Sequence, residues 1–340
     1  MQTHPLSAIL LPTMPSRAKS GLAEKVLAGD VRAAARLISN LENGAPGALA
    51  EMDSLYPHTG RAYIVGVTGA PGVGKSTLID NLVGLFRQEN MSVGVIAIDP
   101  TSALTGGALL GDRVRMQRHS TDPGVFIRSL ATRGWVGGLA RSALGVIHVM
   151  DALGRDIILV ETVGSGQVEI DIVRVADTAL LVLAPGAGDE IQMMKAGILE
   201  LVDILVINKA DKEGAESLKT TLEAMLNLRC CPDGWPPGIV LTEAIHDKGT
   251  SELAGAILRH RAFLTSGGGL GERRRERARL ELVETSEAFI KDSIRRIDKG
   301  NYLEKMADEL VQGKTTPHRA GQDIVRRLAA EIGKSRRKRP

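Results

Sequence analysis

The residues with the clearest chemistry belong to a glycine-rich segment, GAPGVGKST, at positions 69–77. It fits the pattern G-x-x-x-x-G-K-[ST], in which backbone N–H groups surround phosphate oxygens. Glycine suits such a loop because no side chain stands between the backbone and the phosphates. The pattern predicts that Lys75 contacts the β- and γ-phosphates and that the Ser76 hydroxyl joins a magnesium shell. The predicted nucleotide contacts here are Gly69, Ala70, Pro71, Gly72, Val73, Gly74, Lys75, Ser76 and Thr77.

A chance match in a glycine-rich chain is the alternative explanation for this segment. The flanking residues argue against it, since 63–67 form an apolar, β-branched run typical of a strand and 77–86 continue with helical periodicity. The amino end of that helix adds its positive dipole to the site. A dinucleotide fingerprint is not supported, because its third glycine is missing. The segment therefore predicts binding of a nucleoside triphosphate.

A second segment, NKAD at 208–211, predicts which base is bound. The Asp211 carboxylate can accept hydrogen bonds from N1–H and the exocyclic amine of guanine, an arrangement that adenine does not offer. Asn208 would brace the pocket, and the stem of Lys209 would lie along the base. A four-residue match is weak by itself, but this one follows a predicted strand. It indicates GTP rather than ATP.

Carboxylates that could hold the metal follow other predicted strands. Glu161 begins the segment ETVG, which stands where Ras-like GTPases carry Asp-x-x-Gly. Glu161 can bind magnesium through water, and the Gly164 N–H can contact the γ-phosphate. Asp99 and Asp112 are the other candidates, with a helix N-cap as the alternative role of Asp112. Loss of the γ-phosphate on hydrolysis would release the loops that make these contacts.

The water-positioning glutamine of Ras-like GTPases has no counterpart directly after Gly164, since Gln167 lies three residues further on. Arg113, Arg115 and Lys195 are candidates for positive charge at the transferring phosphate. Hydrolysis at such sites is slow without that charge, and we expect a partner protein to accelerate it. The predicted catalytic residues are Lys75, Glu161, Gly164 and Lys195.

These segments need a sheet that brings the ends of several strands together. Short apolar runs alternate with helix-patterned stretches over 59–266, as in βαβ units. The predicted fold class is α/β, a P-loop GTPase domain with a doubly wound, mostly parallel sheet and its ligand at the carboxyl ends of the strands. Strands are expected at 63–67, 93–98, 125–128, 156–160, 178–184, 204–207 and 239–242.

Helical segments are expected on both sides of this domain. Residues 1–20 are unpatterned and predicted to be disordered, and 21–58 form an N-terminal helical segment of two or three short helices. After glycines at 267–271, a long charged helix is expected at 272–296. Two further helices are expected at 302–311 and 317–332.

The thin apolar stripe of the long helix needs a partner surface, so 267–333 are interpreted as a helical dimerisation arm. Residues 334–340 form a basic tail, interpreted as a disordered end. Acidic residues interleave with an arginine cluster near the start of the arm, which favours a solvated helix face over a nucleic-acid patch. The cluster consists of Arg273, Arg274, Arg275, Arg277 and Arg279.

Composition restricts the classes of function. The 43 Lys and Arg residues nearly balance the 40 Asp and Glu residues, which argues against nucleic acid or a membrane as a partner. Aromatic residues make up 3%, which leaves little surface for base stacking. No apolar run approaches the about 20 residues of a membrane span. The adjacent Cys230 and Cys231 fit a reducing compartment, and we expect a cytoplasmic protein.

With these motifs, the chain resembles the methylmalonyl-CoA mutase-associated GTPases of the MeaB/ArgK type. The similarity runs from about 21 to 333. It is densest in the phosphate loop, in DPTSALTGGALLGDRVRM from Asp99, in the ETVG segment and in APGAGDEIQMMKAGILE. The resemblance implies GTP and GDP as ligands and Mg²⁺ among positions Ser76, Asp99, Asp112 and Glu161. It also implies a mobile loop at 185–195 that couples the nucleotide to a mutase.

The resemblance further implies a homodimeric chaperone. Such proteins gate the transfer of adenosylcobalamin into an acyl-CoA mutase and protect that mutase, which stimulates GTP hydrolysis in turn. The chain departs from the family at Thr242-Glu243-Ala244, where Ser-Ala or Ser-Gly is usual. Glu243 and Ala244 are nevertheless the expected last contacts with the base.

Three other functions are alternatives. A metal-inserting GTPase of urease or hydrogenase maturation shares the sheet and the glutamate, but it normally has a His-rich or Cys-containing metal motif. The seven histidines here are scattered. A protein-targeting GTPase would carry an Asp-Thr-Ala-Gly-Arg switch. The family's older description as a transport-associated ATPase or kinase is disfavoured by the guanine motif.

Overall fold

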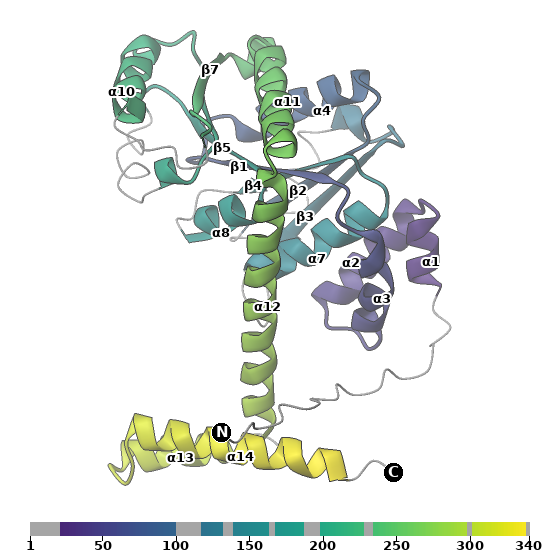
Figure 1. Cartoon of the computed structure of the whole chain (residues 1–340), viewed down its shortest axis with the longest axis vertical. Coiled ribbons are helices and arrows are strands. Elements are labelled where there is room, and N and C mark those ends of the chain that lie inside the picture. Colours follow the sequence, from purple (N-terminus) through teal and green to yellow (C-terminus); the bar gives the residue numbers. More distant parts are fainter. Residues whose placement is uncertain are drawn as a thin grey trace, which may run out of the picture.

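The computed structural model describes residues 21–99, 117–131, 139–162, 167–186, 198–227, 234–297 and 301–337. Within these ranges one sheet has the strand order β3-β2-β4-β1-β5-β6-β7, and all neighbouring strands are parallel (Figure 1). The predicted doubly wound α/β fold is confirmed. The strands are β1 (Tyr63–Thr68), β2 (Val93–Asp99), β3 (Val125–Ala131), β4 (Ile157–Thr162), β5 (Thr178–Leu183), β6 (Ile204–Asn208) and β7 (Gly238–Thr242).

Helices cover both faces of the sheet and continue on either side of it in the sequence. They are α1 (Leu22–Leu27), α2 (Val31–Glu42), α3 (Ala48–Leu55), α4 (Lys75–Gln88), α7 (Leu139–Ala152), α8 (Gln167–Val175), α10 (Ala215–Asn227), α11 (Thr250–Ser266), α12 (Gly269–Arg296), α13 (Asn301–Val311) and α14 (Pro317–Arg337). Short 3₁₀ turns are η1 (Tyr56–His58), η2 (Gln117–His119), η3 (Ile198–Glu200) and η4 (Ala244–His246).

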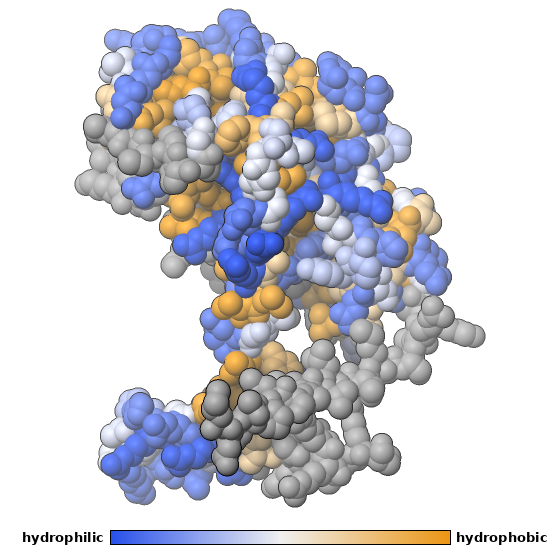
Figure 2. All heavy atoms as spheres, in the orientation of Figure 1, coloured by the Kyte–Doolittle hydropathy of each residue, from blue (hydrophilic) through white to orange (hydrophobic). Residues whose placement is uncertain are grey.

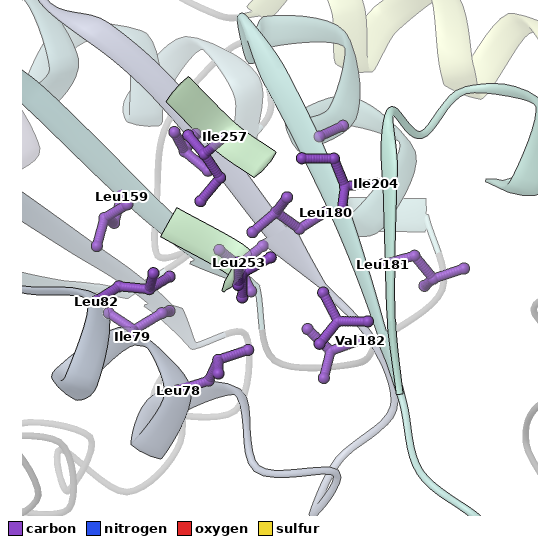
Figure 3. Close-up of a cluster of buried hydrophobic side chains, with 14 of the residues drawn as sticks. Leu78, Ile79, Leu82, Leu159, Leu180, Leu181, Val182, Ile204, Leu253 and Ile257 are labelled. Atoms are coloured by element: carbon purple, nitrogen blue, oxygen red, sulfur yellow. The ribbon is translucent and has the colours of Figure 1, made fainter. Parts of the chain in front are cut away.

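The central strands are apolar throughout because both of their faces are buried. In β1, Val65 and Val67 face a core shared with α4 and α11, whereas Ile64 faces a second core with α7 and α8. The apolar residues of α4 recur at helical spacing, which gives this helix one buried face. Figure 3 shows them beside Leu159 of β4 and Leu253 of α11. The buried residues of that face are Leu78, Ile79, Leu82, Val83 and Phe86.

The three N-terminal helices pack against one another and against α7, and they extend the second core. Asp151 of α7 fixes the chain where it enters β1. Its carboxylate accepts hydrogen bonds from the backbone N–H groups of Gly60, Arg61 and Ala62 at 2.5, 3.2 and 3.0 Å. This contact sets the start of the strand that leads into the phosphate-loop segment.

Helix α12 leaves the sheet domain as a long rod whose far end meets α13 and α14 (Figure 1). Its 28 residues give a length of about 42 Å. Apolar side chains lie open along the middle of this rod, shown in orange in Figure 2. The exposed apolar residues of α12 are Leu282 (68%), Val283 (56%), Phe289 (65%) and Ile290 (47%).

The base of α12 is tied to the amino ends of β5 and β6 by buried charges. Arg273 forms a bidentate ion pair with Asp203, with both N–O distances 2.7 Å. Arg277 donates to Asp177 at 2.9 Å and to the Val175 carbonyl oxygen at 2.8 Å. The two carboxylates are 3% and 0% exposed. The carboxylates of both ion pairs are therefore shielded from solvent.

The interpretation of the arginine cluster as a solvated helix face was wrong for three of its five members. Besides Arg273 and Arg277, Arg274 donates to the carbonyl oxygens of Gly60 and Ala62. The reason is that α12 starts directly below the sheet, where backbone carbonyls and two aspartates need donors. Arg279, paired with Glu276 on the helix surface, does behave as predicted.

Other helix ends differ little from the prediction. Helix α14 continues to Arg337, so the first part of the basic tail is helical rather than disordered. Asp112, whose alternative role is a helix N-cap, lies outside the described residues, and the described chain resumes at the turn η2. Among the described residues, no helix is long and apolar enough to cross a membrane. The cytoplasmic location stays a prediction.

Candidate functional site

The segment 69–74 lies between the carboxyl end of β1 and the amino end of α4, and its glycines are required by geometry. Gly69, Gly72 and Gly74 have φ angles of 149°, 78° and 100°, which disfavour side chains. A Cβ at Gly69 would lie 2.2 Å from the Val182 carbonyl oxygen. A Cβ at Gly74 would lie 2.3 Å from Nδ2 of Asn208. The backbone thus stays bare where the pattern expects phosphates.

Helix α4 begins at Lys75, and its N-cap residue, Gly74, makes no side-chain cap hydrogen bond. The N–H groups of the first turn and the helix dipole together form a site for an anion. The Lys75 ammonium, 5% exposed, donates to the carbonyl oxygens of Gly69 at 2.6 Å and Ala70 at 2.9 Å. This places a positive charge within the same loop.

Ser76 and Glu161 bring two oxygen-bearing groups together beside the loop. Ser76 Oγ donates to Glu161 Oε1 at 2.7 Å, and Glu161 is 4% exposed near the end of β4. Magnesium in proteins prefers oxygen ligands, so a hydroxyl and a buried carboxylate fit part of its shell. Within the described ranges, no cluster of three or more His, Cys, Asp or Glu side chains could hold a metal ion by itself.

The NKAD segment is bonded directly to the phosphate-loop segment. Asn208 Nδ2 donates to the Val73 carbonyl oxygen at 2.7 Å, and Lys209 Nζ donates to that of Gly72 at 2.7 Å. Lys209 has a φ of 59°, a left-handed conformation that is uncommon outside glycine. The chain turns sharply there, directly after β6. As a result, the predicted base-reading and phosphate-binding segments form one connected unit.

The segment after β7 completes this edge of the sheet. Asn208 Oδ1 accepts from Thr242 Oγ1 at 3.1 Å and from the Ala244 N–H at 3.0 Å. Glu243 accepts hydrogen bonds from Lys248 at 3.0 Å and His246 at 3.2 Å. The bond from Lys248, with a smaller effect of His246, holds the pKa of the Glu243 carboxyl below its usual value. In this structure Glu243 thus serves to close its own loop.

Most of the predicted site residues lie at this one edge, as the strand order requires. Thr77 is exposed in the first turn of α4, and Asp211 is exposed after β6. Asp99 is the last residue of β2, but its side chain is not in the described part. Five other candidate residues lie outside the described ranges, namely Asp112, Arg113, Arg115, Gly164 and Lys195.

Asn81 of α4 reaches the same edge and was not among the predicted site residues. Its Nδ2 donates to the Ala244 carbonyl oxygen at 2.7 Å. The signal was visible in the segment LIDNLV, where Asp80 and Asn81 interrupt a run of apolar residues on a helix. A polar pair within an apolar run indicates buried polar partners.

Comparison with known proteins shows close relatives over most of the chain. The profile of the family described as methylmalonyl Co-A mutase-associated GTPase MeaB matches residues 34–298. A relative from Pyrococcus abyssi, named a GTPase, is 50% identical over 310 residues, which cover 90% of this chain and 96% of the relative. The GTPase ArgK of Escherichia coli is 35% identical over 231 residues, 67% of this chain and 70% of that protein.

A relative named methylmalonic aciduria type A homolog, mitochondrial, from Caenorhabditis elegans is 33% identical over 270 residues. These residues cover 78% of this chain and 68% of that protein. Among solved structures, a protein described as LAO/AO transport system kinase superposes with a TM-score of 0.65. It is 24% identical and covers 94% of this chain and 100% of its own, which supports the fold.

Proposed function

The chain belongs to the MeaB family of methylmalonyl-CoA mutase-associated GTPases, and we propose that it hydrolyses GTP to GDP and phosphate at the carboxyl edge of the sheet in the service of an acyl-CoA mutase. The observation that carries the GTP site is the direct bonding of Asn208 and Lys209 to the carbonyl oxygens of Val73 and Gly72. These bonds support the proposal because they hold the predicted guanine-reading segment beside the predicted phosphate-binding segment.

The proposed roles follow the chemistry of each group. The N–H groups of 69–77 bind the phosphates, and Lys75 stabilises the negative charge on the β- and γ-phosphates. Asp211 accepts from the guanine N1–H and amine, and Glu243 and Ala244 border the base. Gly164 contacts the γ-phosphate, and Lys195 supplies positive charge during transfer.

A magnesium ion, when bound, neutralises charge on the phosphates. The Ser76 hydroxyl and the Glu161 carboxylate are the described groups that would hold it, and Asp99 and Asp112 are the further candidates from the sequence. The Ser76 to Glu161 hydrogen bond supports this assignment, since it keeps both oxygens at one point of the edge.

Base recognition is tested by the change Asp211→Asn. An amide donates where the carboxylate accepted, so kcat/KM for GTP should fall by at least about a hundredfold while that for XTP rises. Initial rates of phosphate release with both nucleotides measure this. Asp53→Asn, the same change at an exposed position of α3, is the matched control. An unchanged preference for GTP over XTP would mean that Asp211 does not read the base.

We propose an adenosylcobalamin-dependent acyl-CoA mutase as the partner, with the GTPase gating cofactor loading and protecting the mutase. The family description and the name of the Caenorhabditis elegans relative support this proposal. Purified methylmalonyl-CoA mutase should co-elute with the protein in at least one nucleotide state. It should also accelerate phosphate release, and Lys75→Ala should abolish that acceleration. If the two proteins stay separate with GDP, with a GTP analogue and without nucleotide, the partner is wrong.

A homodimer formed through the arm is proposed on the exposed apolar residues of α12. Contiguous apolar surface on a protruding helix is typical of an interface. Phe289→Glu combined with Leu282→Glu should halve the mass measured by light scattering. Lys291→Gln on the same helix is the control. A monomeric parent protein would contradict this proposal.

A further inference from the structure

Two polar residues lie on the otherwise apolar inner side of α4. Asp80 is 9% exposed and Asn81 is 7% exposed. Burial of polar side chains costs free energy unless hydrogen bonds replace those to water. Neither residue belongs to the phosphate-loop pattern or to the guanine motif, so their contacts call for a separate explanation.

The Asn81 amide bridges two parts of the chain that are distant in sequence. Its Nδ2 donates to the Ala244 carbonyl oxygen at 2.7 Å, and its Oδ1 accepts from Arg118 Nη2 at 2.9 Å. Arginine can only donate and a carbonyl can only accept, so these partners allow just one orientation of the amide. Arg118 thereby fixes which end of Asn81 faces Ala244.

Arg118 is itself held in place by the neighbouring residue of α4. Its Nε lies 2.6 Å from Asp80 Oδ2 in an ion pair. His119 Nε2 lies 3.0 Å from the Asp80 carbonyl oxygen, which secures the turn η2 against the same helix. Asp80, Arg118 and Asn81 therefore form a short chain of contacts that ends on Ala244.

Ala244 is held through both of its backbone polar groups. Its N–H donates to Asn208 Oδ1 at 3.0 Å, and its carbonyl accepts from Asn81. The residue is 4% exposed, so water does not compete with these bonds. Two buried asparagines thus hold it, one from the helix that follows the phosphate loop and one from the guanine motif.

We propose that Asn81 is a positioning residue for guanine recognition. It holds Ala244 against Asn208 and so sets the distance between the base-reading loops and the helix that begins at the phosphates. The inference rests on the proposed GTP site, and it adds a residue that determines base preference without touching the nucleotide. Arg118 and Asp80 orient this residue.

The test compares GTP with ATP, which share their phosphates. In Asn81→Asp, a carboxylate oxygen replaces the donor and repels the Ala244 carbonyl oxygen. We expect kcat/KM for GTP to fall about tenfold, with kcat nearly unchanged and kcat/KM for ATP unchanged. A merely structural role would lower kcat/KM for GTP and kcat/KM for ATP by the same factor. Asn227→Asp, the same change at an exposed residue of α10, is the control.

A second variant guards against misfolding of the first. Arg118→Gln removes the ion pair with Asp80 from a side chain that is 50% exposed, so the fold should persist. The GTP to ATP preference should fall about threefold, in the same direction as for Asn81→Asp. The proposal would be overturned if kcat/KM fell equally for GTP and ATP, or if the ratio of kcat/KM for GTP to that for ATP were unaltered in both variants. A parent protein without preference for GTP would instead refute the guanine site, and the positioning role with it.

Discussion

The two edges of the sheet use charge in opposite ways. At the carboxyl edge, Lys75 donates to carbonyl oxygens of its own loop, beside bare glycine backbone. At the amino edge, Asp177 and Asp203 are fully buried and paired with arginines of α12. In the proposed function the first edge binds a ligand, whereas the second edge pairs its carboxylates with arginines of the same chain.

The amino edge of the sheet thus anchors α12, whereas the carboxyl edge serves the proposed catalysis. Buried ion pairs add little net stability relative to apolar packing, but breaking one leaves a costly unpaired charge. At the amino edge that penalty opposes any departure of α12 from its position. At the carboxyl edge the glycines keep the backbone bare, which leaves room for the proposed phosphates.

The largest effect is expected at the amino edge, from Asp177→Ala. The change removes the partner of Arg277 and the acceptor of the Ile64 N–H, which lies 2.9 Å from Asp177 Oδ2. The free energy of unfolding should fall by about 3–5 kcal/mol, as for other broken buried pairs. Urea denaturation measures it. Asp177→Asn keeps the shape and should cost less, and hydrolysis per folded molecule should be retained. If Asp177→Ala lowered the free energy of unfolding by less than about 1 kcal/mol, the proposed difference between the two edges would be contradicted.

At the carboxyl edge, Lys75→Ala should lower the rate of hydrolysis rather than the stability of the fold. Phosphate release should slow about a hundredfold to a thousandfold, because a charge that stabilises the transferring phosphate is lost. Stability should change little compared with Asp177→Ala. Single-turnover hydrolysis and urea denaturation on the same preparation separate the two effects. Hydrolysis at the parent rate would show that Lys75 has no catalytic role.

The smallest effect is expected for a partly exposed pair, Arg87 and Asp122, near the amino ends of β2 and β3. The Arg87 guanidinium, through its hydrogen bond, holds the pKa of Asp122 below its ordinary value of 3.8. The side chains are 26% and 28% exposed, so solvent screens the pair. Asp122→Asn should cost less than about 1 kcal/mol at pH 7.

The sign of the pH dependence follows from the lowered pKa. The stabilisation by Asp122 is complete above 3.8 and is lost as the pH falls through the lower folded pKa. The stability difference between the parent and Asp122→Asn should therefore shrink below that pH. If the stability difference between the parent and Asp122→Asn instead grew as the pH fell, the stabilising role of the Asp122 carboxylate would be contradicted.

The phosphate-loop segment and the guanine motif were readable from the sequence because each is a contiguous set of residues whose order carries its chemistry. The strands that flank these two segments were predicted from runs of apolar residues. Three arginines near the start of α12, Arg273, Arg274 and Arg277, were misread because their neighbours in sequence suggested solvent. The partner of Arg273, Asp203, lies 70 positions away, and the partner of Arg277, Asp177, lies 100 positions away. Asn81 was overlooked because its partners are also distant in sequence, since Arg118 lies 37 positions away and Ala244 lies 163 positions away.

By itself, the sequence determined the parallel sheet and the kind of ligand expected at its carboxyl edge, since both depend on local periodicity and on short motifs. Only the tertiary structure decided which charges are buried, where α12 is anchored and which side chain holds Ala244. Those outcomes depend on pairs of groups that folding brings together, and no local pattern encodes the distance between them.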